Sequence, residues 1–378
     1  MGLKIGILLP KSDMFPALGL NLLNGINLSL KINASKLDPQ FIVEGVGNAA
    51  DDSILKIIDK LILQESIDLL IGFFSISRLK ELTPKINSYK IPFIHIDLGG
   101  SILKKECKSP NMLHLSLGLC QSAYAAGMYA AKNFGNKGFA ASSFYDGGYQ
   151  LTESFNRGFK KNGGTIENYY VSILDYKSDT YEKMLKDIEE TQPDIMFVVF
   201  SYNEGKKVFD ILSNSNFNGK IPIVAIPVMT DEIINKEDYS IEKVYSMASW
   251  SFDDTTIQMQ NFIKEYYLAY EESPNIMGLL GYESGQVLLE SCTAEGKINH
   301  KLSEVLKNKV INSPRGKISF NAMNESQTES FKLRTFNFNK KRYHNTVINE
   351  FDTSFTEELY SEFESIPFTG WMNPYICT

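Results

Sequence analysis

Short apolar runs that alternate with amphipathic segments are the feature of this 378-residue sequence that most limits its fold. Four strand-like runs, "KIGILLP", "FIVEGVG", "DLLIGFF" and "IPFIHI", are separated by segments with helical spacing, such as Leu18, Leu22, Ile26 and Leu30. Strands and helices that alternate in this way form a parallel sheet with right-handed crossovers. The N-terminal third therefore predicts a doubly wound α/β fold.

A second alternating set begins near Gly138, with the runs "GFAASSFY", "TIENYYVSI", "DIMFVVFS", "IPIVAIPV" and "KVYSMASW" and a helix from Tyr149 to Asn162. A chain of this length exceeds what one hydrophobic core normally serves, so we expect two similar sheets in tandem. Two further helices, at about Thr255–Tyr270 and Met277–Glu290, have no strand between them. We expect them to pack back onto an existing sheet.

The C-terminal part changes to extended pieces, "FKLRTFNF" and "HNTVINEF", joined at a hairpin tip in "NKKRYH". A final amphipathic helix is predicted to start with a capping box of Ser354 and Glu357. Phe355, Leu359 and Phe363 would share its buried face. No Lys or Arg follows the hairpin tip, and we interpret this acidic segment as a solvated outer face.

Composition excludes several classes of protein. A formal net charge of -7 without a basic stripe argues against a nucleic-acid surface, and no apolar run reaches the roughly 18 residues of a membrane span. The "MG" ahead of the first strand is compatible with a leader that has been removed. The four cysteines, Cys107, Cys120, Cys292 and Cys377, show no Cys-x-x-Cys spacing, so their pairing stays open.

Motifs for catalysis and cofactor binding are missing from the sequence. It has no Gly-x-Gly-x-x-Gly or Walker loop, no Gly-x-Ser-x-Gly, and no pair of histidines at metal-ligand spacing. We therefore expect neither a cofactor nor a metal. His95 and Asp97 share one face of a strand end, where they would be a base with its orienting carboxylate or simply polar lining. An enzyme is the weaker class.

The stretch "IGFFSISRLKELTP" places Ser75 and Ser77 where a strand ends and a helix begins. Unpaired N–H groups and the helix dipole make such a junction attractive to anions. The alternative is that one of these serines is an N-cap that holds the helix start. The residues alone leave both interpretations open.

Six segments in order carry a resemblance to a known family: "KIGILLP" with "ALGLNLLNGINLSLKIN", "DLLIGFFS", "IPFIHI", "FYDGGYQLTESFNRGFKKNGGTI", "QPDIMFVVFSYNEG" and "SPRGKISFN". Together, over residues 3 to 340, they resemble the type I solute-binding proteins of ABC transporters, in the leucine/isoleucine/valine-binding group. The resemblance implies two lobes joined by three crossovers near residues 118, 250 and 325. Lobe 1 would comprise 1–117 and 252–325, and lobe 2 would comprise 118–251 and 326–378.

The resemblance also implies binding residues on the first lobe. The family's carboxylate-binding hydroxyl falls at Ile76, between Ser75 and Ser77, so that backbone N–H groups would remain available for a ligand carboxylate. The next contacts, for carboxylate and ammonium, fall at Asp97 and Gly99. An acidic side chain thus stands where the family has a small residue.

On the second lobe, the rim aromatic is matched by Tyr149, and a second aromatic position falls at Ser201 beside Tyr202. The acidic partner of the ligand ammonium falls at Pro227, so either Asp97 supplies that charge or the solute is not an α-amino acid. Three apolar residues are expected at the side-chain end of the pocket: Phe15, Leu18 and Met277.

Taken together, the residues and the resemblance predict an extracytoplasmic, non-enzymatic receptor that delivers a small carboxylate-bearing solute to the permease subunits of an ABC importer. The solute would be an amino acid or a related acid, held by hinge closure between the lobes. One alternative is a sensor of the same fold, either an amide-type regulator or a receptor ectodomain. The other is a hydrolase that uses His95 and Asp97.

Overall fold

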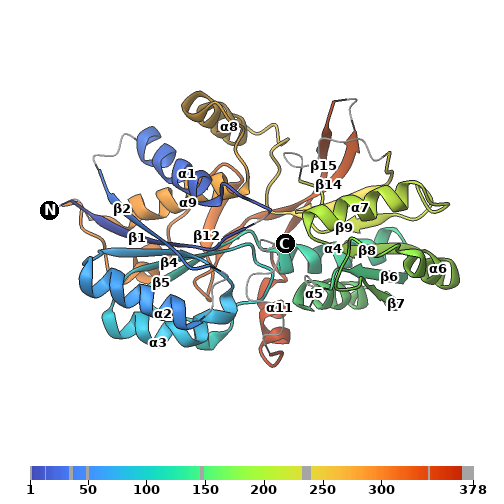
Figure 1. Ribbon diagram of the computed structural model, residues 1–378, viewed down its shortest axis with the longest axis horizontal. Helices are drawn as coiled ribbons and strands as arrows, with labels where there is room; N and C mark the ends of the chain where they lie inside the picture. Colours follow the sequence, from blue (N-terminus) through green and yellow to red (C-terminus); the bar gives the residue numbers. More distant parts are fainter. Residues whose placement is uncertain are drawn as a thin grey trace.

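The computed structural model describes residues 2–12, 14–33, 37–47, 51–144, 149–231, 240–293, 295–338 and 341–367. Two sheets with their helices lie side by side along the longest axis (Figure 1). The first sheet has the order β2-β1-β3-β4-β5, and its strands are parallel. Its strands are β1 (Lys4–Leu9), β2 (Gln40–Gly45), β3 (Leu69–Phe73), β4 (Phe93–Asp97) and β5 (Met112–Ser116).

The helices of the first sheet follow the predicted alternation, and the doubly wound α/β prediction is confirmed. α1 lies on one face and α2 and α3 on the other (Figure 1). All five residues of β3 are buried, as expected of a strand covered on both sides. The helical segments are α1 (Leu18–Ile32), α2 (Asp51–Asp59), η1 (Lys60–Gln64), η2 (Ile76–Arg78), α3 (Leu79–Tyr89) and η3 (Lys105–Cys107).

The second sheet has the order β15-β14-β10-β9-β8-β6-β7. Its part from β7 to β10 is parallel and repeats the strand order of the first sheet, whereas β14 and β15 add an antiparallel hairpin. The predicted hairpin is confirmed, although tip residues 339 and 340 lie outside the described residues. The strands are β6 (Lys137–Ser142), β7 (Thr165–Val171), β8 (Ile195–Val199), β9 (Ile223–Ala225), β10 (Val244–Ala248), β14 (Ser330–Phe338) and β15 (Tyr343–Asp352).

Four helices belong to the second sheet, and the remaining elements connect or extend the two halves. The four are α4 (Leu119–Asn133), α5 (Tyr149–Lys161), α6 (Glu182–Thr191) and α7 (Tyr202–Ser213). The others are α8 (Ile257–Tyr270), α9 (Ile276–Ser291), α10 (Leu302–Leu306), α11 (Thr356–Phe363) and a small sheet of β11 (Ile311–Ser313), β12 (Gly316–Phe320) and β13 (Ser326–Thr328). No described helix has the length and apolarity that a membrane crossing requires.

Helix α9 returns to the first sheet and packs against α1, as predicted. The two backbones meet at glycines: a Cβ at Gly25 would lie 2.1 Å from the carbonyl oxygen of Gly278, and one at Gly281 would lie 2.1 Å from that of Leu22. Only residues without a side chain allow this approach. We call the first sheet with α1–α3, α8 and α9 the first half of the molecule.

The second half, which is the seven-stranded sheet with α4–α7, uses the same device. A Cβ at Gly127 of α4 would lie 2.2 Å from the carbonyl oxygen of Phe155, and one at Gly158 of α5 would lie 2.0 Å from that of Tyr124. The glycines are three residues from the partner carbonyls on each helix, as in the first half. The two halves therefore repeat a helix pair as well as a strand order.

The chain passes between the halves after β5, after β10 and between β13 and β14, and one buried ion pair ties these passages together. Arg315 Nε lies 2.7 Å from Glu283 Oε1, and both side chains are almost fully buried. The Arg315 guanidinium also donates to the carbonyl oxygen of Ser116 at 2.9 Å and to Ser249 Oγ at 2.7 Å. The Arg315 side chain thus contacts residues that lie next to two of the three passages.

Helix α11 begins later than predicted, and the capping box is wrong. Its N-cap is Phe355, which makes no side-chain capping bond. The Ser354 N–H donates instead to Asp352 Oδ1 at 2.9 Å, and Thr356 Oγ1 donates to the carbonyl of Thr353. A turn closed by Asp352 therefore replaces the box. The predicted apolar face is confirmed, because Phe355, Leu359 and Phe363 are buried.

Helix α11 contacts both the second half and the passages. The Phe355 ring stacks on Tyr124 of α4 at 5.2 Å, and Glu362 pairs with Arg157 of α5 at 3.2 Å. On the other side, the Tyr360 hydroxyl donates to Glu325 Oε2 and accepts from Asn321 Nδ2 at 3.0 Å. Figure 1 shows α11 below the junction of the two halves.

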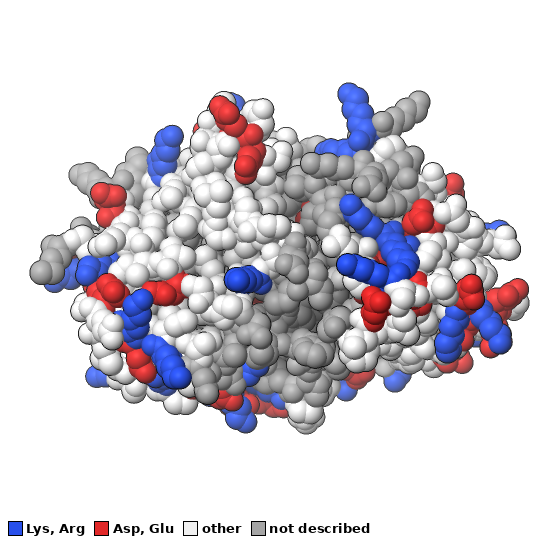
Figure 2. Space-filling view, viewed as in Figure 1, with Lys and Arg blue, Asp and Glu red and all other residues white. Residues whose placement is uncertain are grey.

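Charge is mixed on the face of the protein that Figure 2 shows. Lys and Arg are interspersed with Asp and Glu on the face shown in Figure 2, without a continuous basic area over either half.

Cys107, Cys120 and Cys292 are free thiols, and burial raises the pKa of Cys107 to about 11. Cys377 lies outside the described residues.

Candidate functional site

The junction after β3 is organised by Ser75, which is the N-cap of η2. Its Oγ accepts from the Ser77 N–H at 3.4 Å and lies 3.1 Å from Ser77 Oγ. Ser75 is buried, whereas Ser77 is partly exposed. The N-cap interpretation of this serine pair is therefore confirmed, and a ligand contact by either hydroxyl stays a prediction.

The carboxylate of Asp97, the last residue of β4, accepts hydrogen bonds from backbone that follows β3 and from backbone that follows β4. Its Oδ2 accepts from the Ile76 N–H at 3.3 Å, and its Oδ1 accepts from the Gly99 N–H at 2.6 Å. The backbone at Gly99 has a φ of +83°, a conformation that glycine adopts without strain. For Ile76, the expectation that the backbone N–H remains available for a ligand carboxylate is wrong, because the Asp97 carboxylate accepts from it.

The ionisation of Asp97 reflects this position. Burial raises the pKa of Asp97 to about 6, and the N–H groups of Gly99, Ile76 and Gly100 oppose that rise by bonding to the charged form. The described residues include no Lys, Arg or His at ion-pair distance from this carboxylate. Asp97 is also partly exposed at its strand end, so it is a carboxylate held by backbone dipoles alone.

Gln150, in the first turn of α5, joins the two halves and was missed by the sequence analysis. Its Oε1 accepts from the backbone N–H of Ile102 at 2.6 Å, in the loop after β4. Its Nε2 is buried and has no hydrogen-bond partner in the described structure. The only available signal was its place beside Tyr149 in "DGGYQ", the segment that carries the family's rim aromatic.

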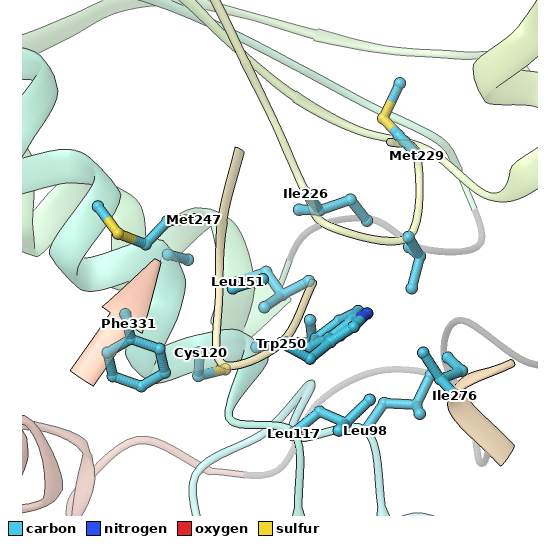
Figure 3. Close-up of a cluster of buried hydrophobic side chains, with 14 of the residues drawn as sticks. Leu98, Leu117, Cys120, Leu151, Ile226, Met229, Met247, Trp250, Ile276 and Phe331 are labelled. Carbon is cyan, nitrogen blue, oxygen red and sulfur yellow. The ribbon is translucent and has the colours of Figure 1, made fainter. Parts of the chain in front are cut away.

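Trp250 is the second residue that the sequence analysis missed, and it follows the end of β10. Its side chain is fully buried, and the indole Nε1–H has no hydrogen-bond partner among the residues that the structure describes. Figure 3 shows the ring next to Leu151 of α5 and above Leu98 and Leu117 of the first half, with its nitrogen on the side away from Leu151. The strand-end rule for parallel sheets would have identified this position.

The remaining predicted site residues are placed as follows. Tyr149 and Tyr202 begin α5 and α7, but their side chains lie outside the described residues. Ser201 is the buried N-cap of α7. The apolar residues Phe15, Leu18 and Met277 belong to the larger of two core clusters, which runs through both halves. Their contact with a ligand stays a prediction.

The hydrolase alternative has no geometric basis, because His95 faces the core. Its Nε2 lies 2.8 Å from the carbonyl oxygen of Phe74, and its Nδ1 lies 2.6 Å from Nδ1 of His114. Neither ring nitrogen bonds Asp97, and the imidazole is fully buried. The alternative of a His95–Asp97 dyad is wrong, because the two side chains bond different partners. The interpretation of His95 as polar lining is wrong as well, because its side chain is buried in the core.

His95 belongs instead to a buried chain of polar groups that ends at α11. The Phe74 carbonyl requires a proton on His95 Nε2, so His114 Nδ1–H donates to His95 Nδ1 and His114 Nε2 faces Glu325 Oε1 at 3.7 Å. Burial lowers the pKa of His114 to about 3 and raises the pKa of Glu325 to about 7. No group of His, Cys, Asp and Glu among the described residues is arranged to hold a metal.

A family model described as periplasmic binding protein matches residues 2–340. The chain belongs to the periplasmic binding protein family. The predicted resemblance is thereby confirmed at the level of the family. Comparison of the sequence with curated proteins found no match.

Several solved structures share the fold of the chain. An ABC transporter substrate-binding protein from Sphaerobacter thermophilus has a TM-score of 0.79 at 18% identity, over 93% of this chain and 98% of that one. A solute-binding protein from R. palustris in complex with benzoate has a TM-score of 0.75 at 21% identity, over 92% and 96%. A branched-chain amino acid binder from Streptococcus pneumoniae in complex with isoleucine has a TM-score of 0.67 at 16% identity, over 92% and 100%.

Proposed function

We propose that this chain is the extracytoplasmic receptor of an ABC importer and binds a small carboxylate-bearing solute, an amino acid or a related acid, between its two lobes. The lobes are 1–117 with 252–325 and 118–251 with 326–378. Closure by a hinge motion traps the solute, and the closed form delivers it to the permease subunits. No reaction is catalysed.

The observation that carries the proposal is the amide of Gln150. Its oxygen is bound to the first half at the Ile102 N–H, while its buried Nε2 keeps its donors without partners. A buried amide nitrogen without a partner is costly, and an acceptor on a bound solute removes that cost. The Trp250 Nε1–H is a second buried donor of this kind, and Figure 3 places its ring beside the residue that follows Gln150. Carboxylate oxygens are the acceptors that suit two such donors.

Binding strength explains why both lobes are required. Micromolar affinity corresponds to about 8 kcal/mol, whereas one hydrogen bond contributes roughly 1 kcal/mol. Burial of apolar ligand surface adds about 25 cal/mol per Å², and this gain is complete only when both lobes cover the solute. A ligand that contacts both lobes in the closed form therefore shifts the population toward it.

Solutes of related structures support this choice of chemistry. The R. palustris protein is a complex with benzoate, and the S. pneumoniae protein is a complex with isoleucine. Both solutes are small and bear one carboxylate. The carboxylate that they share supports the solute class proposed here. Isoleucine also carries an ammonium group and benzoate does not, so the choice between amino acids and other acids depends on the site itself.

Isothermal titration calorimetry tests the proposal, with L-isoleucine, L-phenylalanine and benzoate as probes. We expect at least one probe to bind with micromolar affinity and to reduce the radius of gyration in small-angle X-ray scattering. Gln150→Ala should weaken that binding at least tenfold, because it removes an amide donor and the bond to Ile102.

The matched control is Gln40→Ala, at the exposed start of β2, which should leave affinity unchanged. The proposal is overturned if no probe binds. It is also overturned if a probe binds without a change in the radius of gyration and with equal affinity for the Gln150 and Gln40 variants.

A further inference from the structure

Glu325 carries a buried carboxyl group that the proposed solute site does not use. It directly precedes β13, and its backbone pairs beside His114 of β5, so it is fixed to the first sheet. No described Lys or Arg lies at ion-pair distance from it. The polar and titratable groups that face it come from four elements: His114 and Ser116 of β5, Asp97 of β4, Gln121 of α4 and Tyr360 of α11. Nothing cationic therefore compensates the charge of an ionised Glu325.

The hydrogen bonds on the α11 side leave Glu325 only the role of an acceptor. The Tyr360 hydroxyl accepts from Asn321 Nδ2 at 3.0 Å, so its own hydrogen is directed to Glu325 Oε2. Gln121 Nε2 is also a donor and lies 3.3 Å from each carboxyl oxygen. A proton of the carboxyl group therefore has no place on this side.

The other carboxyl oxygen faces a second acceptor. His114 donates its Nδ1–H to His95, so its Nε2 presents a lone pair, and Glu325 Oε1 lies 3.7 Å from it. This Nε2 is buried and has no hydrogen-bond partner in the described part of the chain. With an ionised Glu325, two buried acceptors would face each other without a hydrogen, which is costly. One proton between them removes this conflict, whichever of the two atoms holds it.

The same carboxyl group is bonded across the passages that join the halves. Gln121 lies in the first turn of α4, directly after the first passage. Tyr360 belongs to α11, which is tied to α4 and α5 through Phe355 and Glu362. A change in the relative position of the halves therefore changes the hydrogen bonds of Glu325. Proton binding and the arrangement of the halves must then influence each other by the same free energy.

We propose that His114 and Glu325 form a proton-binding site at the hinge, and that the proton held by this pair stabilises the arrangement of the halves in which Gln150 bonds Ile102. Loss of the proton separates Glu325 Oε1 from His114 Nε2 and weakens the contacts with α4 and α11. The link to the solute rests on the proposed function. Because a solute bound at Gln150 favours the same arrangement, the protein takes up a proton when it binds that solute.

Burial places the titration of this pair near neutral pH. It raises the pKa of Glu325 to about 7 and lowers the pKa of His114 to about 3. Because the pKa of Glu325 is raised in this arrangement, the stabilisation is complete at low pH and is lost as the pH rises through 7. Burial also raises the pKa of Asp97 to about 6, so a comparison with a variant at Glu325 is needed to separate the two carboxyl groups.

Small-angle X-ray scattering of the full chain without solute tests the hinge by itself. The radius of gyration should be larger at pH 8 than at pH 6. Glu325→Gln offers an N–H to His114 and an acceptor to Tyr360, as a protonated acid does, so its radius should change less. Glu290→Gln is the matched control, because Glu290 is exposed on α9 and pairs with Lys309, and it should respond as the unmodified protein does.

Calorimetry at pH 6 and pH 8 adds the solute, with the tightest of L-isoleucine, L-phenylalanine and benzoate as the probe. None of these probes titrates in this range. The ratio of the affinities at pH 6 and pH 8 should be about tenfold larger in the unmodified protein than in Glu325→Gln. At pH 7, titrations in phosphate and Tris buffers should show that the unmodified protein takes up about half a proton more per solute than the variant.

Tyr360→Phe provides an independent test if Glu325→Gln does not fold. It keeps the aromatic ring of α11 but removes a donor that stabilises the ionised form of Glu325. The midpoint of the change in radius should therefore move to higher pH. A purely structural role of the hydroxyl would leave this midpoint in place.

The outcomes separate the proton site from the proposed function. The proton site is overturned if radius and affinity respond to pH equally in the unmodified protein and in Glu325→Gln, or if the midpoint does not rise in Tyr360→Phe. If no probe binds, the proposed function fails, and the radius of the protein without solute alone decides on the proton site.

Discussion

The two halves of the molecule have the same strand order, but the ends of their strands differ in chemistry. Strand pairing aligns Phe93 with Leu70 in the first sheet and Ile223 with Met196 in the second. Four residues further along, the first half has Asp97 and the second has Pro227. The first half thus ends this strand in a carboxylate, whereas the equivalent position of the second half is a proline, whose side chain has no hydrogen-bond donor or acceptor. The two halves therefore share a scaffold and differ in the residues at their strand ends.

The interiors of the halves differ in the same way. The buried pair His95 and His114 of the first sheet corresponds by strand pairing to Ala225 and Ser246 of the second. A titratable chain thus crosses only the first sheet. In the second, Ser246 Oγ accepts from the buried Arg334. Four predictions measure how far the halves are equivalent.

The largest effect is expected at the joint between the halves. Arg315→Ala leaves the Glu283 carboxylate buried without its partner, which should lower the free energy of unfolding by about 4 kcal/mol in chemical denaturation. Arg342→Ala is the control, since its ion pair with Asp253 is partly exposed and should contribute under about 1 kcal/mol. Equal losses in the two variants would show that the passages are not held by Arg315.

The helix pairs should respond equally in the two halves. Gly281→Ala and Gly127→Ala each place a methyl group about as close to a backbone carbonyl, at 2.1 and 2.2 Å. Each should cost about 3 kcal/mol of unfolding free energy, because a backbone atom cannot move aside as a side chain can. Gly45→Ala, with no neighbour within 4 Å, should be neutral. A large cost in one half alone would break the equivalence of the pairs.

An effect on the ligand side is expected at Tyr149, at the start of α5. Tyr149→Ala should weaken binding of the tightest probe at least tenfold, about 1.4 kcal/mol, with little change in the melting temperature. An aromatic at the rim contributes mainly on closure, so the unliganded protein should be unaffected. Unchanged affinity by calorimetry would remove Tyr149 from the site.

The smallest effect concerns pH and the first half alone. Because the pKa of Glu325 is raised to about 7 by burial, the folded protein keeps a proton that the unfolded chain has released, and stability falls as pH rises toward and through 7. The lowered pKa values of His95 and His114 act oppositely, so stability is lost as pH falls below about 6.5. We expect a maximum of stability between these ranges.

Glu325→Gln removes the Glu325 contribution, so the difference in unfolding free energy between the unmodified protein and the variant should shift by about 1 kcal/mol in favour of the variant between pH 6 and pH 8, and both proteins should keep the decline on the acidic side. Thermal unfolding at a series of pH values measures both. A difference between the two proteins that stays constant from pH 6 to pH 8 would assign this titration to other groups.

Local pattern was sufficient to predict most of the fold. Runs such as "DLLIGFF" are buried on both faces, and a strand buried in this way consists almost entirely of apolar residues. Such a strand can therefore be predicted from the sequence without knowledge of its contacts. The return of α9 to α1 followed from the lack of a strand before it. The prediction of a capping box failed because Asp352 accepts the Ser354 N–H and forms a turn at this position. The spacing of Ser354 and Glu357 does not reveal that this turn replaces the box.

The candidate site was harder to predict, because its decisive contacts are long-range. The bond from Ile102 to Gln150 spans 48 positions, and nothing near Gln150 in the sequence indicates it. Asp97 was identified, but its occupation of the Ile76 N–H depends on how two strands end relative to each other. Trp250 was overlooked because its lack of a hydrogen-bond partner is a property of the packed interior.

Helix α11 has a practical consequence for following the protein at work. Its aromatic and charged residues contact α4 and α5, while Tyr360 contacts Glu325 and Asn321 next to the third passage. Any rotation of one half against the other must alter one of these two sets of contacts. A fluorophore attached at Glu364, at the end of this helix, would therefore report ligand-driven rearrangement from a point far along the chain from Asp97, without a label near the solute.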